Sequence, residues 1–244
     1  MVKCISFDFD RTLSHVVPLT HFYIPKLLKE KGIEISVDEF VRSSINLRNN
    51  LPQSLVNRFA IYGTLSQAER RQFIYEYNMA RIDNLNLDKE INELNEIKNW
   101  IVEKLMQNQK KLLYDDVIST IKLLKQDNYL LYIQSGNHSD GIIELLDEAG
   151  LLPLFEEIVT VDRFHPDKVE NFRTILNLSK LNPKEILHIG DDLETDGKAV
   201  DYGINTVIIR RPKQLFFDDK HLLSNYKVIS ELSELLEYLA DLSL

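Results

Sequence analysis

The chain has 244 residues, 44% of them hydrophobic and 27% charged, which is enough to bury one hydrophobic core and a second, smaller one. Its formal net charge of -9 argues against a general nucleic-acid or anionic-membrane binder, and its single cysteine excludes an intrachain disulfide. No signal-peptide pattern follows Met1 and no apolar run reaches transmembrane length, so we expect a soluble, cytoplasmic protein without a membrane partner.

The first apolar run ends in a pair of aspartates. Val2 to Phe7 is short and β-prone, which predicts a buried strand of a parallel sheet. Asp8 and Asp10 follow directly, at the carboxyl end of that strand, where open α/β sheets bind their ligands. Two carboxylates held close together repel each other unless a cation or a shared proton lies between them. The stretch is therefore a candidate site.

The next hundred residues have a helical pattern. Ser36-x-x-Glu39 and Ser66-x-x-Glu69 are capping-box patterns that each open a predicted helix. Asp88 to about Gln109 gives a long amphipathic pattern with a mostly apolar stripe. Because no strand pattern falls between residues 15 and 112, we predict an all-helical cap, residues 15–113, inserted after the first strand.

From Tyr114 the pattern alternates between strands and helices. The predicted strands are Tyr129–Ile133, Ile158–Val161, Ile186–Ile189 and Thr206–Ile209. The predicted helices include Ser139–Ala149, Asp167–Leu178 and Ser230–Leu242. Such alternation is typical of a parallel sheet with right-handed crossovers. We therefore predict an α/β fold with a Rossmann-like core of residues 1–14 and 114–244, and hinges near 15–18 and 111–114.

Polar side chains gather at the predicted carboxyl ends of several strands. Asp191 and Asp192 follow one strand, as Asp8 and Asp10 follow the first, and such a carboxylate cluster suits Mg²⁺. No cluster of Cys or His offers a zinc site instead. Ser135-Gly136-Asn137, between a strand and a helix, offers a hydroxyl and backbone N–H groups to an anion such as phosphate.

These stretches together resemble four motifs of the haloacid dehalogenase (HAD) superfamily. Asp8-Phe9-Asp10-Arg11-Thr12-Leu13 is similar to its first motif, DxDxT, and Ser135 after an apolar strand to its second. Lys168 matches the third motif, although proline precedes this lysine here instead of following it. Gly190-Asp191-Asp192-Leu193-Glu194-Thr195-Asp196 is similar to the fourth. The resemblance covers the whole predicted core, whereas the cap resembles the family in placement and helicity alone.

The resemblance implies a Mg²⁺-dependent phosphatase that works through an aspartyl-phosphate. Asp8 is implied as the nucleophile and Asp10 as the acid and base, a role that favours a raised carboxyl pKa. The implied phosphate-binding groups are Ser135, the N–H groups from Gly136 onward, and Lys168. The implied metal ligands are Asp8, the Asp10 carbonyl and Asp191, with Asp192 or Asp196 assisting. The dehalogenases of this superfamily lack the second aspartate, so Asp10 favours a phosphatase.

Plainer interpretations stay open for several of these residues. Asp8 and Asp10 are also typical of strand-end turns, and Lys168 is also typical of a solvated first turn of a helix. Asp192 and Asp196 are equally compatible with supporting positions beside the metal or with helix N-terminal charges. His188 lies inside an apolar strand and is most simply a core residue.

The function expected from the sequence is hydrolysis of a small phosphorylated metabolite. A phosphoryl-transferring mutase on the same scaffold is one alternative, and a HAD-like binding or regulatory module with little turnover is another. A serine hydrolase is disfavoured because the G-x-S-x-G elbow is missing. The sequence selects neither the substrate nor the oligomeric state.

Overall fold

The protein forms two compact units in a computed structural model that describes residues 1–216 and 220–242. The α/β unit comprises residues 1–15 and 111–244, and the helical unit comprises residues 16–110. That these units act as a catalytic core (1–14 and 114–244) and a cap (15–113), with hinges at the joins, stays a prediction.

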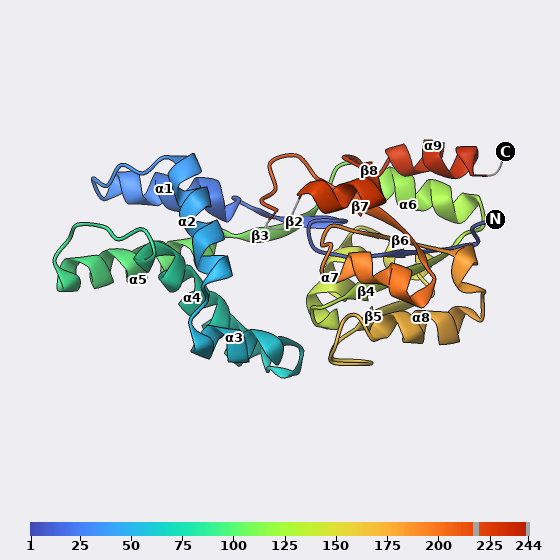
Figure 1. Cartoon of the computed structure of the whole chain (residues 1–244), viewed down its shortest axis with the longest axis horizontal. Helices are drawn as coiled ribbons and strands as arrows, with labels where there is room; N and C mark the ends of the chain where they lie inside the picture. The colour runs from blue at the N-terminus through green and yellow to red at the C-terminus, as the bar shows by residue number, and fades with distance from the viewer. Residues whose placement is uncertain (217–219, 243–244) are drawn as a thin grey trace. The chain divides into compact units, whose positions relative to one another are not determined.

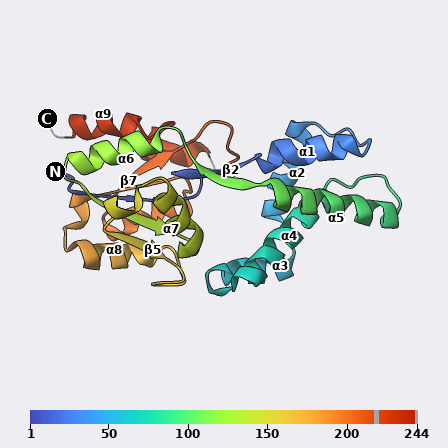
Figure 2. The same cartoon turned by 180° about the vertical axis from the view of Figure 1, so that it is seen from behind.

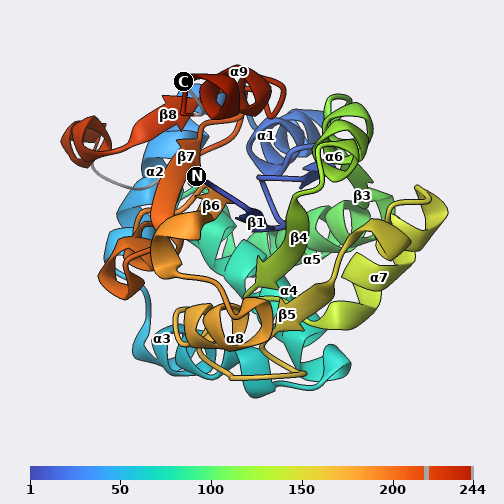
Figure 3. The same cartoon turned by 90° about the vertical axis from the view of Figure 1, so that its right-hand side faces the viewer.

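The α/β unit is built on a six-stranded sheet in the order β5-β4-β1-β6-β7-β8 (Figure 3). Its strands are β1 (Cys4–Phe7), β4 (Leu130–Ser135), β5 (Glu157–Thr160), β6 (Ile186–Gly190), β7 (Asn205–Ile209) and β8 (Lys227–Ile229). Each pair of neighbouring strands is parallel. From β1 the chain adds strands first on one side and then, from β6 onward, on the other. The order therefore reverses between β1 and β6, which is where open α/β sheets place their ligand sites.

Helices cover both faces of this sheet, as Figure 1 shows for α6 and α9 on one face and α8 on the other. They are α6 (Val117–Gln126), α7 (Ser139–Glu148), α8 (Asn171–Ser179) and α9 (Glu234–Asp241), with 3₁₀ segments at Leu152–Leu154, Pro183–Glu185, Asp196–Tyr202 and Lys220–Asn225. Side chains alternate along β1, as the pleat of a strand requires. Ile5 and Phe7 join the apolar cluster under α6, α7 and α9, whereas Cys4 joins the cluster under α8. The predicted parallel α/β architecture is confirmed.

The helical unit contains α1 (Thr20–Glu30), α2 (Val37–Asn49), α3 (Gln53–Ala60), α4 (Gln67–Asp83), α5 (Ile91–Asn108) and a 3₁₀ turn at Tyr62–Thr64. Helix α5 packs against α1 and α4 around its own apolar core (Figure 2). Ser66 and Glu69 form the predicted capping box, and the Ser36 hydroxyl accepts from the Glu39 N–H at the start of α2. None of the helices described is long and apolar enough to cross a membrane.

Two short strands occupy the joins, where the sequence predicted none. β2 (Ser14–Val17) and β3 (Lys110–Leu113) pair with each other in a separate two-stranded sheet. The prediction of no strand between residues 15 and 112 is wrong here. Four-residue segments such as Ser-His-Val-Val and Lys-Lys-Leu-Leu are too short to show an alternating pattern, and their pairing joins positions almost a hundred residues apart.

Two predicted helices begin later in the structure than their apolar patterns suggested. α8 starts at Asn171 and not at Asp167, because the Asp167 carboxylate accepts from the Val169 N–H in a turn. α9 starts at Glu234 and not at Ser230, because the Glu234 carboxylate accepts from the backbone N–H groups of Ser230 and Glu231.

The edge strand β8 was not predicted from the sequence, because its three residues are too few to show an alternating apolar pattern.

Candidate active site

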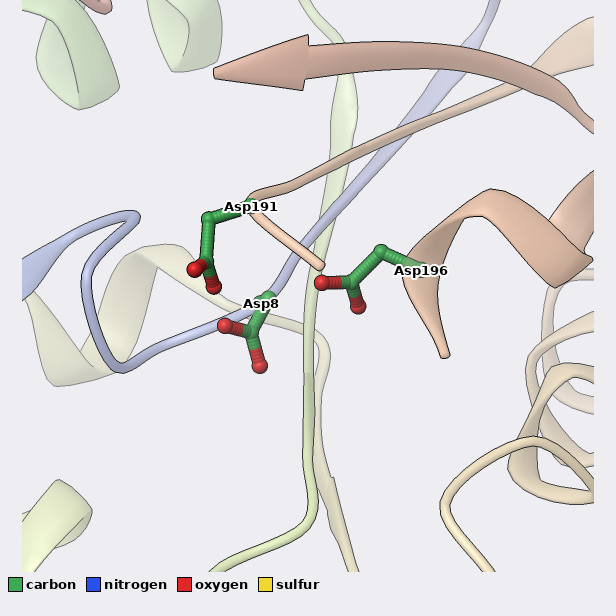
Figure 4. Close-up of side chains that lie close together, drawn as sticks. All are labelled: Asp8, Asp191 and Asp196. Atoms are coloured by element: carbon green, nitrogen blue, oxygen red, sulfur yellow. The ribbon is translucent and has the colours of Figure 1, made fainter. Parts of the chain in front are cut away.

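Three carboxylates converge at the carboxyl ends of the two central strands. Asp8 follows β1, Asp191 follows β6, and Asp196 opens the 3₁₀ segment after β6. Each offers an oxygen that lies within 4.8 Å of the others, and all three side chains are buried. Figure 4 shows the three carboxyl groups turned toward one another. The sequence motifs thus meet at the reversal point of the sheet.

Lys168 lies among these carboxylates. Its Nζ is 2.7 Å from Asp8 Oδ1 and 2.6 Å from Asp196 Oδ1, and its side chain is only 14% exposed. Burial lowers the pKa of Lys168, but the charges of Asp196 and Asp8 outweigh it and raise that pKa above its ordinary value. Lys168 is therefore a buried cation paired with two carboxylates, and its interpretation as a solvated surface lysine is wrong.

The protein itself provides hydrogen-bond donors to both oxygens of Asp196. Oδ1 accepts from Lys168 and lies 3.1 Å from His188 Nε2, while Oδ2 accepts from the Asp192 N–H at 3.0 Å. Burial raises the pKa of Asp196, but Lys168 and the His188 hydrogen bond outweigh it and hold that pKa well below its usual range. Gly190 makes room for this carboxyl, because a Cβ at Gly190 would lie 2.1 Å from Asp196 Cγ. Asp196 is thus a firmly held anion.

Asp191 is the least satisfied member of the group. Burial raises its pKa to about 7, with Arg11 opposing and Asp196 adding to the shift. Arg11 Nη2 lies 2.9 Å from Asp191 Oδ2, yet this buried oxygen accepts no well-aligned hydrogen bond from any described residue. Arg11 and Asp191 therefore form an ion pair whose geometry is not that of a hydrogen bond. Arg11 itself has φ +61°, a left-handed conformation that is uncommon outside glycine.

The carboxylate cluster fits a hard divalent cation. Burial raises the pKa of Asp8 well above its ordinary value, and Asp196 and Asp191 add to that rise against the opposing charge of Lys168. A cation would lower the cost of ionising Asp8 and Asp191, and Asp191 Oδ2 still lacks a hydrogen-bond donor among the described residues. The donor set is entirely oxygen, which suits Mg²⁺ or Ca²⁺ better than a soft metal.

Asp10 lies beyond the strand in a different environment. Its carboxylate accepts from Lys111 Nζ at 2.6 Å, from Ser14 Oγ at 3.2 Å and from Asn137 Nδ2. Burial raises the pKa of Asp10, but Lys111 and these hydrogen bonds outweigh it, so the pKa is lowered. We expected a raised value. The sequence could not show that a lysine from β3, a hundred residues further on, would lie against this carboxyl.

The predicted phosphate-binding loop follows β4. Ser135 is buried at the end of this strand, and its Oγ accepts from the Asn137 N–H at 3.1 Å. Gly136 lies against Lys168, because a Cβ on Gly136 would be 3.5 Å from Lys168 Cδ. The two predicted phosphate-binding segments are therefore neighbours. Their contact with phosphate stays a prediction.

The structure groups some of the predicted metal ligands and separates others. The carboxylates of Asp8, Asp191 and Asp196 form the cluster, whereas those of Asp10 and Asp192 lie outside it. Asp192 Oδ1 accepts from the Glu194 N–H at 3.0 Å, as a turn-forming aspartate does. Metal ligation by the Asp10 carbonyl, and by Asp192, stays a prediction.

Several side chains of the site were not predicted to contact the aspartates. Arg11, Lys111 and Asn137 contact the aspartates through side chains whose placement depends on tertiary structure. His188 was interpreted as a core residue; it is buried, but it is also hydrogen-bonded to Asp196. The sequence signal for a role of His188 beyond the core was its place as a polar residue within the otherwise apolar strand β6.

Comparisons with known proteins identify the family and the fold of this chain. The family model of haloacid dehalogenase-like hydrolases matches residues 2–200. No curated protein matches the sequence.

Among solved structures, a predicted phosphoglycolate phosphatase from Haemophilus somnus 129pt has a TM-score of 0.59 at 17% identity, covering 97% of each chain. A dehalogenase has a TM-score of 0.62 at 16% identity, over 97% of this chain and 96% of the other. The HAD-hydrolase YfnB from Bacillus subtilis, bound to magnesium, has a TM-score of 0.57 at 20% identity, over 98% and 99%. At these identities, the structural likenesses show the fold.

Proposed function

This chain belongs to the haloacid dehalogenase-like hydrolases, and from that premise we propose that it is a Mg²⁺-dependent phosphomonoesterase acting on a small phosphorylated metabolite. The observation that carries the proposal is the buried group of Asp8, Lys168 and Asp191 at the sheet's reversal point, with Asp10 two residues beyond the nucleophile. This group combines a nucleophile, a cation for phosphoryl oxygens and a metal ligand.

The reaction proceeds in two displacements. An Asp8 carboxylate oxygen attacks phosphorus while the ester P–O bond breaks, and the proton of Asp10 goes to the departing alkoxide. Water then attacks the phosphorus of the aspartyl-phosphate, its proton goes to Asp10, and the bond from phosphorus to Asp8 breaks to release inorganic phosphate. Splitting the hydrolysis in this way lets one carboxylate act as nucleophile and the other as acid, then base.

Asp10 must carry a proton before the first displacement. Lys111 and the hydrogen bonds from Ser14 and Asn137 lower its pKa in the structure. A phosphate dianion beside Asp10 acts in the opposite direction, because a like charge disfavours the ionised carboxyl. Substrate binding therefore favours the protonation state that cleavage requires, and Asn137 orients the carboxyl meanwhile.

The cations of the site neutralise the transferring group. A bound Mg²⁺ would be held by Asp8 and Asp191, and it supplies positive charge that offsets the repulsion between the Asp8 carboxylate and phosphate. Lys168 donates toward phosphoryl oxygens from its fixed place between Asp8 and Asp196. The Ser135 hydroxyl and the N–H groups after it form the remaining donors.

The presence of Asp10 supports a phosphatase over a dehalogenase. A halide leaves without a proton, whereas an alkoxide needs one. The Asp10 carboxylate is held by three donors, from Lys111, Ser14 and Asn137. A structural neighbour named as a dehalogenase and one named as a predicted phosphoglycolate phosphatase share the fold equally well. The distinction therefore depends on this side chain.

The decisive experiment measures inorganic phosphate released from an aryl phosphate by the purified full chain, with Mg²⁺ and with excess chelator. We expect Mg²⁺-dependent release that falls by about 10⁴-fold or more in Asp8→Asn, as for other nucleophile deletions. Asp127→Asn is the matched control, since it removes an equal charge from an exposed residue outside the cluster. Equal rates for wild type and Asp8→Asn would contradict the proposal. A screen of phosphoglycolate, sugar phosphates, nucleotides and amino-acid phosphates then identifies the substrate class.

A further inference from the structure

Two polar side chains lie within the apolar strands behind the site. Ser6 of β1 and His188 of β6 are direct register partners, and both are fully buried. Ser6 Oγ is 2.8 Å from His188 Nδ1, and the rings of His188 and Phe172 of α8 pack edge to face with their centroids 4.8 Å apart. A buried polar pair lowers the stability of the fold unless each polar group forms a hydrogen bond.

The partners of His188 determine which ring nitrogen carries hydrogen. Both oxygens of Asp196 already accept from donors, Oδ1 from Lys168 Nζ and Oδ2 from the Asp192 N–H, so this carboxyl group acts as an acceptor. His188 Nε2, 3.1 Å from Asp196 Oδ1, must therefore be the protonated nitrogen. Nδ1 is then the acceptor, and the Ser6 hydroxyl donates to it. Burial lowers the pKa of His188, which is consistent with a neutral ring of this tautomer.

The same carboxylate oxygen holds Lys168. Asp196 Oδ1 accepts from both His188 Nε2 and Lys168 Nζ, and Lys168 Nζ lies 2.7 Å from Asp8 Oδ1. A continuous chain of contacts thus runs from Ser6 through His188, Asp196 and Lys168 to Asp8. The Asp192 N–H holds the other oxygen of Asp196, so rotation of this carboxyl would break contacts on both sides.

We propose that Ser6 and His188 position Lys168 for phosphoryl transfer by fixing the orientation of Asp196. The proposal rests on the phosphatase function proposed above, because it assigns the pair a role in that reaction. No hydrogen bond joins His188 to Asp8 or Lys168 among the described residues, so the pair acts on Lys168 through the shared Oδ1 of Asp196. It follows that Asp196 serves as the anchor of the lysine, with its oxygens committed to donors of the protein, and leaves metal binding to Asp8 and Asp191.

The test compares two replacements of His188 in the full chain. His188→Gln keeps an N–H donor at about the reach of Nε2, whereas His188→Met keeps the volume and removes the donor. For the aryl phosphate, we expect kcat of His188→Met to fall about 10- to 100-fold, the usual cost of losing a supporting hydrogen bond behind a reactive group. KM should stay within about threefold, and His188→Gln should recover most of kcat. Equal kcat for His188→Met and wild type would overturn the proposal, as would equal losses in both variants.

A packing control separates positioning from general destabilisation. Cys4→Ala removes a buried thiol from the same apolar cluster as Phe172. Cys4 belongs to none of the contacts that link Ser6, His188, Asp196, Lys168 and Asp8. We expect its kcat to match wild type while its melting temperature falls. If His188→Met does not fold, as judged by circular dichroism, Ser6→Ala takes its place with an expected loss of about threefold to tenfold; a Ser6→Ala kcat equal to wild type would then overturn the proposal.

A second readout does not depend on turnover. Proton–nitrogen correlation spectra of the histidine rings, assigned with His188→Gln, report which nitrogen bears hydrogen. We expect hydrogen on Nε2 of His188, and a ring without hydrogen on Nε2 overturns the proposal. If the wild type shows hydrogen on Nε2 but releases no phosphate from any substrate, the proposed phosphatase function is wrong, whereas the hydrogen bonds that link Ser6, His188 and Asp196 are confirmed.

Discussion

Asp8 and Asp10 are two residues apart in the sequence and lie in opposite environments. Asp8 is buried directly at the end of the central strand, and its N–H donates to the Ile189 carbonyl of β6 at 2.8 Å. Asp10 lies in the turn beyond the strand, with 30% of its side chain exposed and Lys111 beside it. Burial raises the pKa of Asp8, whereas Lys111 outweighs the effect of burial and lowers the pKa of Asp10.

Under the proposed mechanism, this difference allows one short motif to supply two chemical roles. The proposed nucleophile, Asp8, is fixed to the sheet and surrounded by carboxylates that favour a nearby cation. The proposed acid and base, Asp10, is partly exposed to solvent. Variants that affect one aspartate's surroundings and leave the other's intact test this separation.

Among these variants, the largest effect is expected for Asp10→Asn, and it should depend on the leaving group. A substrate with an alkyl leaving group needs the acid, whereas an aryl oxide departs without much help. We expect kcat/KM, which reports the first displacement and not the later hydrolysis in which Asp10 acts as base, to fall about 10²- to 10⁴-fold for an alkyl phosphate and much less for the aryl phosphate. Steady-state kinetics on both esters measure the difference. Equal losses on the two substrates would mean that Asp10 does not protonate the leaving group.

Gly190→Ala should disturb the Asp8 side alone. The added Cβ would lie 2.1 Å from Asp196 Cγ, so the carboxyl that holds Lys168 must shift. We expect kcat to fall about tenfold or more, with the free energy of unfolding lowered by about 1–3 kcal/mol through overpacking. The ratio of rates on alkyl and aryl phosphates should stay that of wild type.

Gly141→Ala is the matched control, because no atom of the described residues beyond its chain neighbours and the backbone of α7 lies within 4 Å of a Cβ at Gly141. Denaturant unfolding and kinetics apply to both variants. A Gly190→Ala protein with the kcat and stability of wild type would contradict the packing described for Asp196.

Lys111→Met should have a small effect, confined to the Asp10 side. The Lys111–Asp10 pair is about one-third exposed on both sides, and water screens such pairs. We expect kcat/KM on the alkyl phosphate to change less than about fivefold, since exposed ion pairs contribute at most about 1 kcal/mol. The exposed neighbour Lys110→Met serves as control. A loss of kcat/KM as large as that of Asp10→Asn would mean that Asp10 needs Lys111 to act as the acid.

Asp192→Asn should have the smallest effect. Its carboxylate accepts from the Glu194 N–H and lies outside the three-carboxylate cluster, so we expect the Mg²⁺ dissociation constant to stay within about twofold of wild type. Isothermal titration calorimetry with Mg²⁺ alone measures it. Tenfold weaker binding would place Asp192 among the metal ligands.

The sequence was sufficient for the residues whose position follows from strand ends. Asp8 and Asp191 lie where the parallel-sheet pattern predicted, because the carboxyl ends of adjacent parallel strands meet at one edge. The same reasoning brought Ser135 to that edge. Even so, the start of α8 was placed four residues too early, since an apolar pattern does not show that Asp167 closes a turn.

The sequence was insufficient wherever partners come from distant segments. Lys111 meets Asp10 because β3 crosses near the turn, and β3 itself is too short to be predicted. The lowered pKa of Asp10 was missed for the same reason. Arg11 could be read as part of a motif, but its left-handed backbone and its contact with Asp191 depend on how the loop after β7 and the site fold together.

The central place of β1 has a consequence for exchange of amide hydrogens with solvent. Strands β4 and β6 flank β1 on both sides, and the Asp8 N–H extends the hydrogen-bond ladder by one residue. Amides in such a position become accessible to solvent only through the largest openings of a fold. The Asp8 amide should therefore be among the slowest to exchange with deuterium, which would place Asp8 in the part of the α/β unit that opens last.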